Sequence, residues 1–275
     1  MIQSLMIYSL PIFLAALGGY LTDKAGILNI AIEGLILCGA FITFIFIYFL
    51  DSIFIAVIMA AVLTGLLSAG FAGLTMRFKG NIFITGLAMN LLIPGVITLI
   101  SKRVFLTGGV LQITSTIVTT ETLVLGFLFL SCMIYLISIY LLKNTQAGLL
   151  VRATGLNRRA LEVRGGNPSR VQVLTFLFSG FMCGLSGAML TLTVHAYVPN
   201  ISSGKGWLAL AAIYLGNQKA TGLIYAVLFF AIAEVLANLA QGTFDLPSSL
   251  FVGFPYLVTF IGLIIRGMID RTRRS

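Results

Sequence analysis

The segment IFIAVIMAAVLTGLLSAGFAGLTM, residues 53–76, contains no charged side chain. An α-helix that crosses a lipid bilayer needs about 20 consecutive apolar residues, and this run is long enough. A second run of the same kind covers residues 122–142. Membrane β-strands would instead alternate apolar and polar residues over roughly 10-residue segments. The continuous runs therefore predict membrane-spanning helices.

The composition of the whole chain agrees with this prediction. Of 275 residues, 59% are hydrophobic and 9% are charged, whereas soluble domains carry about 25% charged residues. A chain so poor in charge cannot cover a water-facing surface. The 29 glycines suit a helix bundle, because small residues let helices approach closely in lipid. We expect an all-α, polytopic transmembrane bundle that forms one domain over residues 1–275.

The apolar runs predict about nine spans, within a range of eight to ten. The run at residues 207–217 is too short to cross alone at 1.5 Å per residue. It either extends back through Ser202 or is re-entrant inside the bundle. The runs are 2–20, 27–50, 52–75, 81–100, 122–142, 172–194, 207–217, 221–240 and 250–266.

The lysines and arginines predict the orientation. With the N-terminus outside, only Lys102, Arg103 and Lys205 of the 17 basic residues fall on the outer side. Loops on the cytoplasmic side carry an excess of basic residues, so we predict an N-out, C-in topology. The net charge of +9 then reflects basic loops beside anionic membrane lipid, and no nucleic-acid partner is expected.

The largest polar stretch is the predicted inner loop at about residues 143–171. Within it, Asn157 can cap a short helix over residues 158–164 that ends at Gly165. Pro168 then prevents easy continuation of the helix. Basic and apolar side chains both lie on this helix, so it can rest on lipid headgroups or dock into a groove of a soluble partner. The residues alone leave both uses open.

No catalytic apparatus is predicted. The chain lacks the pattern G-x-x-x-x-G-K-[ST], which cradles ATP phosphates. It also lacks a His, Cys and carboxylate cluster with metal-ligand spacing. We therefore expect no enzyme activity, no metal site and no cofactor bound by this chain. If the protein drives transport, the energy must come from a partner or an ion gradient.

Five polar side chains lie at predicted membrane depth, where such groups are costly and usually functional. Residues 29 and 33 are four apart, as are residues 234 and 238, so each pair is predicted to share a helix face. These side chains either line a solute pathway or form hydrogen bonds that fix helix packing. The five are Asn29, Glu33, Asn90, Glu234 and Asn238.

Three segments carry a family resemblance. AGILNIAIEG, residues 25–34, resembles the G-x-x-N-x-x-x-E-G signature of nucleoside-type permeases. These belong to the branched-chain amino acid and ribose permease group, and residues 152–190 are similar to the loop and following helix of that group. The last third of the group is resembled by residues 206–216 together with AEVLANLAQ, residues 233–241, and FPYLVTF, residues 254–260. In all, the resemblance covers roughly residues 10–266.

The inner loop also resembles the EAA-type coupling loop of ABC importer permeases. Ala160 is followed five residues later by Gly165, as in that loop. Arg159 occupies the usual glutamate position and Leu161 the position of the second alanine. The resemblance implies that an ATPase contacts this loop at Asn157, Arg159, Ala160, Leu161 and Gly165.

The resemblance implies an importer in a bacterial-type plasma membrane. Such an importer has two permease subunits, often of different sequence, a cytosolic ATPase that binds ATP and Mg²⁺, and an external substrate-binding lipoprotein. The implied solutes are nucleosides, with purine nucleosides foremost. Two alternatives stay open, namely the same machinery for a simple sugar such as ribose, and an ion-coupled secondary transporter that acts alone.

Overall fold

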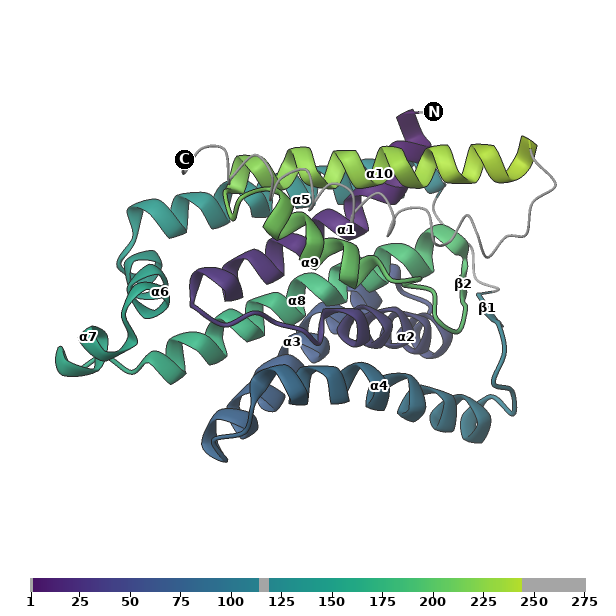
Figure 1. Ribbon diagram of the computed structural model, residues 1–275. Helices are drawn as coiled ribbons and strands as arrows, with labels where there is room; N and C mark the ends of the chain where they lie inside the picture. Colours follow the sequence, from purple (N-terminus) through teal and green to yellow (C-terminus); the bar gives the residue numbers. More distant parts are fainter. Residues whose placement is uncertain (1, 114–118, 244–275) are drawn as a thin grey trace.

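The computed structural model describes residues 2–113 and 119–243 (Figure 1). The predicted span at 250–266 and the basic residues beyond it lie outside this part. The described chain is mostly helical, which confirms the predicted helix bundle. Seven of its helices are long and apolar enough to cross a membrane, where the sequence predicts about nine spans for the whole chain.

The described part of the chain consists of long helices, short helices and one small β-ribbon. The long helices are α1 (Ile2–Lys24), α2 (Ile32–Leu50), α3 (Ile53–Arg77), α4 (Ile82–Val104), α5 (Thr120–Asn144), α8 (Pro168–Val194) and α10 (Ala220–Thr243). The short helices are α6 (Gln146–Leu156), α7 (Arg158–Val163) and α9 (Lys205–Leu215). The antiparallel ribbon pairs β1 (Leu111–Gln112) with β2 (Ala196–Tyr197).

The bundle has two chemically different ends. Figure 1 shows α6 and α7 at one end, called here the α7 end, and the β1–β2 ribbon at the other, the ribbon end. The turns after α1, α3 and α9 also lie at the α7 end. Most described basic residues belong to these turns and to α5–α8, whereas Lys102 and Arg103 end α4 near the ribbon.

Helix α8 lies at the centre of the bundle and packs against α1, α2 and α3. In their most apolar windows, 72% of the residues of α1 and α8 are buried, against 17% for α4 and 22% for α5. Helices α4 and α5 expose large apolar side chains such as Leu91 and Phe129. An apolar exterior of this extent indicates a lipid-facing surface.

Glycines let α8 approach its neighbours closely. A Cβ atom at Gly184 would lie 2.7 Å from the Cα of Ala61 on α3. A Cβ at Gly39 on α2 would lie 2.6 Å from the Cα of Gly184, and one at Gly187 would lie 2.9 Å from the carbonyl carbon of Gly39. Since no larger side chain fits, these glycines serve helix packing, as small residues commonly do in membrane bundles.

The predicted helix over residues 27–50 starts later than expected. Helix α2 begins at Ile32, and residues 25–31, called here the α2 lead-in, are not α-helical. Asn29 therefore does not share a helix face with Glu33, and that prediction is wrong. The Asn29 side chain accepts a hydrogen bond from the backbone N–H of Ala31 at 3.0 Å, and such local bonds compete with helix formation.

The weak run at residues 207–217 is the short helix α9. It extends back only to Lys205 and contains 11 residues, about 16 Å at 1.5 Å per residue. Turns rather than helix precede it from Asn200 to Gly204. The chain thus holds two interrupted helical stretches, one before α2 and one before α9.

Candidate functional site

The starts of α2 and α9 meet through Glu33. The backbone N–H groups of Gly204 and Gly206 donate to its carboxylate at 2.8 and 2.7 Å. The hydroxyl of Ser202 donates to the same carboxylate, and Glu33 as a residue is 9% exposed. A helix start leaves backbone N–H groups unpaired and carries a partial positive charge. The Glu33 carboxylate satisfies both needs at the start of α9.

The approach of α9 to α2 requires glycine. A Cβ atom at Gly206 would lie 2.6 Å from the Cα of Glu33. Gly204 has a φ of +84°, in a region that side chains with a Cβ rarely adopt. The two glycines thus allow the close contact that Glu33 exploits.

Lys205, between these glycines, forms a buried ion pair with Glu234 of α10. The Nζ–Oε1 distance is 3.0 Å, and the two side chains are 8% and 11% exposed. Lys205 was expected in an outer loop; that expectation is wrong, because the opposite charge of Glu234 lets the ammonium group remain inside the bundle. The ammonium group also lies 5.8 Å from the centre of the Tyr8 ring.

Asn29 and Asn90 hold the α2 lead-in in place. The Asn90 side chain accepts from Gly34 N and donates to Ile30 O, both at 2.8 Å. The Asn29 amide donates to the Ser179 hydroxyl of α8 at 3.0 Å. These bonds replace helical backbone bonds at membrane depth, where an unpaired group would be costly. They favour the packing alternative for both asparagines.

Asn238 differs from the other four predicted pathway residues. It lies one turn beyond Glu234 on α10, as predicted, and its side chain donates to the Glu234 backbone carbonyl at 2.8 Å. Its side chain is exposed in the described structure. The structure therefore brings four of the five residues to the two interrupted stretches, and leaves Asn238 beside them on an exposed face.

The predicted capped helix in the polar loop is present as α7. The Asn157 side chain accepts from Ala160 N at 3.0 Å, and Gly165 follows the helix with a φ of +80°. The helix ends at Val163, one residue earlier than predicted. Arg159 and Ala160 are exposed, whereas Leu161 is buried. The Leu161 side chain lies against Gly166, which follows α7, and the exposed face of the helix carries Arg159 and Ala160.

A chain of hydrogen bonds links α7 to the α2 lead-in. The Arg158 guanidinium donates to Ser169 Oγ at 3.0 Å and to Gln172 Oε1 at 3.4 Å, both on α8. The Gln172 amide in turn donates to the carbonyl of Ala25 at 3.2 Å. Neither Arg158 nor Gln172 was predicted as functional, and the bond from Gln172 to Ala25 joins residues 147 positions apart, which leaves no local pattern in the sequence.

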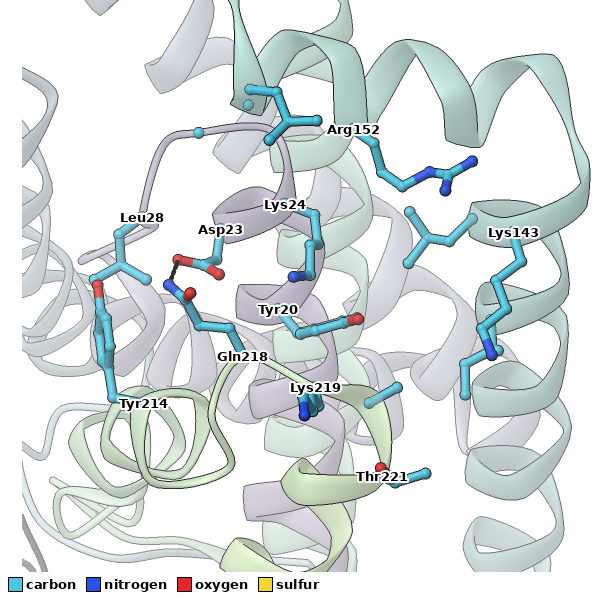
Figure 2. A pocket seen from close by; sticks show the side chains of 16 residues that line it. Tyr20, Asp23, Lys24, Leu28, Lys143, Arg152, Tyr214, Gln218, Lys219 and Thr221 are labelled. Carbon is cyan, nitrogen blue, oxygen red and sulfur yellow. Dashed lines mark hydrogen bonds between the residues drawn. The ribbon is translucent and has the colours of Figure 1, made fainter. Parts of the chain in front are cut away.

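A cavity of about 840 Å³ opens at the α7 end, between α1, α5, α6 and the turn that joins α9 to α10 (Figure 2). Four cations surround it, and we call it the basic cavity. The one carboxylate among its described lining residues, that of Asp23, accepts a hydrogen bond from the Gln218 amide at 3.1 Å. The polar and aromatic residues that line it include Tyr20, Asp23, Lys24, Lys143, Arg152, Tyr214, Gln218 and Lys219.

In residues 2–113 and 119–243, no three His, Cys, Asp or Glu side chains gather closely enough to hold a metal ion. The polar groups at the interrupted stretches are arranged to bond one another. Chemically, this part of the molecule offers hydrogen bonding and charge pairing.

A bundle of apolar helices with buried polar contacts at two interrupted stretches defines a multi-pass integral membrane protein. Residues 1–263 match the family model described as the branched-chain amino acid transport system permease component. The chain belongs to this family of membrane permeases. A solved structure, PsaBC from Streptococcus pneumoniae in complex with Fab, shares the fold with a TM-score of 0.53 at 19% identity, covering 94% of this chain and 89% of that one.

Similar proteins cover most of the chain. The guanosine ABC transporter permease protein NupQ of Bacillus subtilis is 28% identical over 95% of this chain and 90% of its own length. The nucleoside ABC transporter permease protein NupC of Lactococcus lactis subsp. cremoris is 24% identical, with 96% and 91% covered. The ribose import permease protein RbsC of Haemophilus influenzae is 26% identical over 60% of this chain and 53% of its own length.

Proposed function

We propose that this chain is the membrane-spanning subunit of an ABC importer that moves nucleosides, purine nucleosides foremost, into the cell. One observation carries the proposal: a guanosine permease is similar over 95% of the chain. A ribose permease is similar over only 60%, so the simple-sugar alternative has less support. In this proposal the chain offers a path and does no chemistry of its own.

The proposed topology is N-out, C-in with nine crossings. Helix α9 and the residues before it count as one crossing, and residues 250–266 supply the last. The distribution of charge supports this orientation, because the turns at the α7 end are rich in lysine and arginine while α4 brings only Lys102 and Arg103 toward the ribbon. Basic residues favour the cytoplasmic side, so the α7 end faces the cytosol.

We place the ATPase contact on α7. Leu156, the last residue of α6, and Val163, the last residue of α7, are 87% and 85% exposed. Arg159 and Ala160 of α7 are exposed as well, so α7 and the end of α6 together present two apolar side chains and positive charge that a groove on a partner can bind. The partner that fits is the cytosolic ATPase, which binds the ATP and Mg²⁺. The lipid-surface alternative predicts that α7 contacts headgroups instead.

The hydrogen bonds that start at α7 suggest how movement of this helix is passed to the middle of the bundle. Movement of α7 would act on Gln172 through Arg158, and on the α2 lead-in through the carbonyl of Ala25. The lead-in is continuous with Glu33, which holds the start of α9. A displacement at the ATPase would thus reach the middle of the bundle.

The remaining partners follow from the same proposal. A second permease chain completes the pathway, an external lipoprotein selects the solute, and residues 1–275 act as one permease domain. Asn238 is the pathway residue we retain, since it is exposed on α10. For Asn29, Glu33, Asn90 and Glu234 the bonds described above support a structural role.

The test is reconstitution of the chain with its co-purifying subunits in liposomes. Guanosine uptake that requires ATP, with ribose uptake at background, supports the proposal. ATP-dependent ribose uptake without guanosine uptake would favour the sugar alternative. Guanosine uptake by the isolated chain under an ion gradient would identify a secondary transporter instead.

A further inference from the structure

The basic cavity holds more positive charge than the bundle requires. Among the described residues that line it are four cations, from three helices and one turn, and one carboxylate, that of Asp23. In the described part of the chain, the ion pairs are Arg158–Glu162 and Lys205–Glu234. Within residues 2–113 and 119–243, no carboxylate therefore lies within ion-pairing distance of any of the four cavity cations. They are Lys24, Lys143, Arg152 and Lys219.

Only two of these four cations lie at helix C-termini, where the helix dipole stabilises a positive charge. Lys24 and Lys143 lie in the last turns of α1 and α5, where a positive charge is favoured by the helix dipole. Arg152 lies in the interior of α6. Lys219 directly precedes α10 and its carbonyl accepts from Leu223 N at 3.0 Å, so this cation stands at a helix start, where the dipole disfavours it.

An anion in the cavity would offset this charge. The first turn of α10, Ala220 and Thr221, also lines the cavity, and unpaired N–H groups at the start of such a long helix attract anions. Figure 2 shows the lysine side chains extending from different walls around a common space. The charge and the helix start therefore point to the same kind of ligand.

The volume of the cavity and its tyrosine side chains restrict the class of ligand further. A volume of about 840 Å³ lies within the range of small-molecule sites. Tyr20 and Tyr214 line the walls, and the ammonium of Lys24 lies 5.4 Å from the centre of the Tyr20 ring. Tyrosine hydroxyls donate hydrogen bonds, and charged donors bind phosphate oxygens strongly.

We propose that the basic cavity is a binding site for a ligand that carries a phosphate group, held by the four cations and the first turn of α10. Two sources supply this chemistry, namely a soluble phosphate ester such as a nucleotide and the headgroup of an anionic lipid. A bound ligand would join α5 and α6 to the start of α10. The site is separate from the interrupted stretches at α2 and α9.

The experiment measures binding to the full-length chain in nanodiscs of phosphatidylcholine. Titration calorimetry with GMP, with inorganic phosphate and with guanosine tests whether the phosphate is recognised. The double variant Lys143→Gln/Lys219→Gln should weaken GMP binding by roughly tenfold or more, since charge-assisted bonds are lost. The control Lys102→Gln/Arg103→Gln removes the same charge near the ribbon end and should bind GMP normally.

A second arm distinguishes the two sources. If the ligand is a lipid, GMP does not bind, and native mass spectrometry detects phosphatidylglycerol retained by the natural chain and the control but released from the cavity variant. If the ligand is a soluble ester, GMP binds and phosphatidylglycerol is not retained selectively. Equal binding of GMP and lipid by both variants, or no binding by the natural chain, would overturn the proposal. Equal thermal unfolding of both variants checks that the fold is intact.

Discussion

The carboxylate of Glu33, in the first turn of α2, accepts the backbone N–H of Gly206, in the first turn of α9, at 2.7 Å. The two helix starts would repel each other through their partial positive charges, and the carboxylate between them removes that repulsion. Because the contact is buried, water does not substitute for it. The contact leads to the first two predictions.

Replacing Glu33 by Gln should destabilise the protein. The amide brings an N–H₂ group toward the N–H donors of Gly204 and Gly206, so at least one buried donor loses its acceptor, which costs roughly 1–3 kcal/mol. Thermal unfolding in detergent measures the effect. The control is Glu121→Gln, which removes an exposed carboxylate from the first turn of α5. Equal stability of the two variants would contradict the role assigned to Glu33.

Replacing Gly206 by Ala should destabilise the protein by about 1–3 kcal/mol through overpacking. The added Cβ would lie 2.6 Å from the Cα of Glu33, so α9 must move away from α2. The matched control is Gly95→Ala, where no atom lies within 4 Å of the new Cβ and a helix interior favours alanine by about 1 kcal/mol. Unfolding temperatures of the two variants should therefore shift in opposite directions.

The buried ion pair should show strong coupling. Lys205→Met and Glu234→Leu each leave one buried charge without its partner, at a cost of roughly 3–5 kcal/mol. The double variant removes both charges, so its unfolding free energy should fall by much less than the sum of the decreases in the two single variants. A double-mutant cycle on unfolding free energies provides the test. Additive losses would show that Lys205 and Glu234 act independently.

Replacing Ala160 by Asp should abolish nucleoside uptake while membrane insertion stays normal. The new carboxylate lies on the exposed face of α7, where a docked partner would bury it without a matching charge. Uptake by reconstituted vesicles and membrane content on immunoblots separate the two effects. The control Gln146→Asp places a carboxylate in the first turn of α6, where the helix dipole favours it. Normal uptake by Ala160→Asp would remove α7 from the coupling path.

Hydropathy predicted the long helices because each span must bury its own backbone bonds in lipid. The same signal hid the α2 lead-in, since Ile27, Leu28 and Ile30 are as apolar as the helix that follows. The chain leaves the helix there because Asn90, 60 positions along the sequence from Ile30, satisfies the backbone. A contact of that separation has no local pattern.

Charge patterns were informative about loops and misleading about one buried lysine. The capped helix at Asn157 was predictable, because the cap and the glycine that follows the helix, Gly165, lie within one short segment of the sequence. Lys205 between two glycines has the composition of a loop. The signal that could have revealed the buried lysine was Glu234, an acidic residue in the middle of a predicted span. A carboxylate at that depth is usually paired with a cation.

The close backbone contact between Gly39 of α2 and Gly184 of α8 restricts how these two helices can move relative to each other. Interlocked backbones leave no side-chain layer that could shear, so α2 and α8 are expected to travel as a single rigid body. A push received at the start of α8 would then reach α2 undiminished. Relative movement of helices must therefore occur at contacts other than the one between α2 and α8.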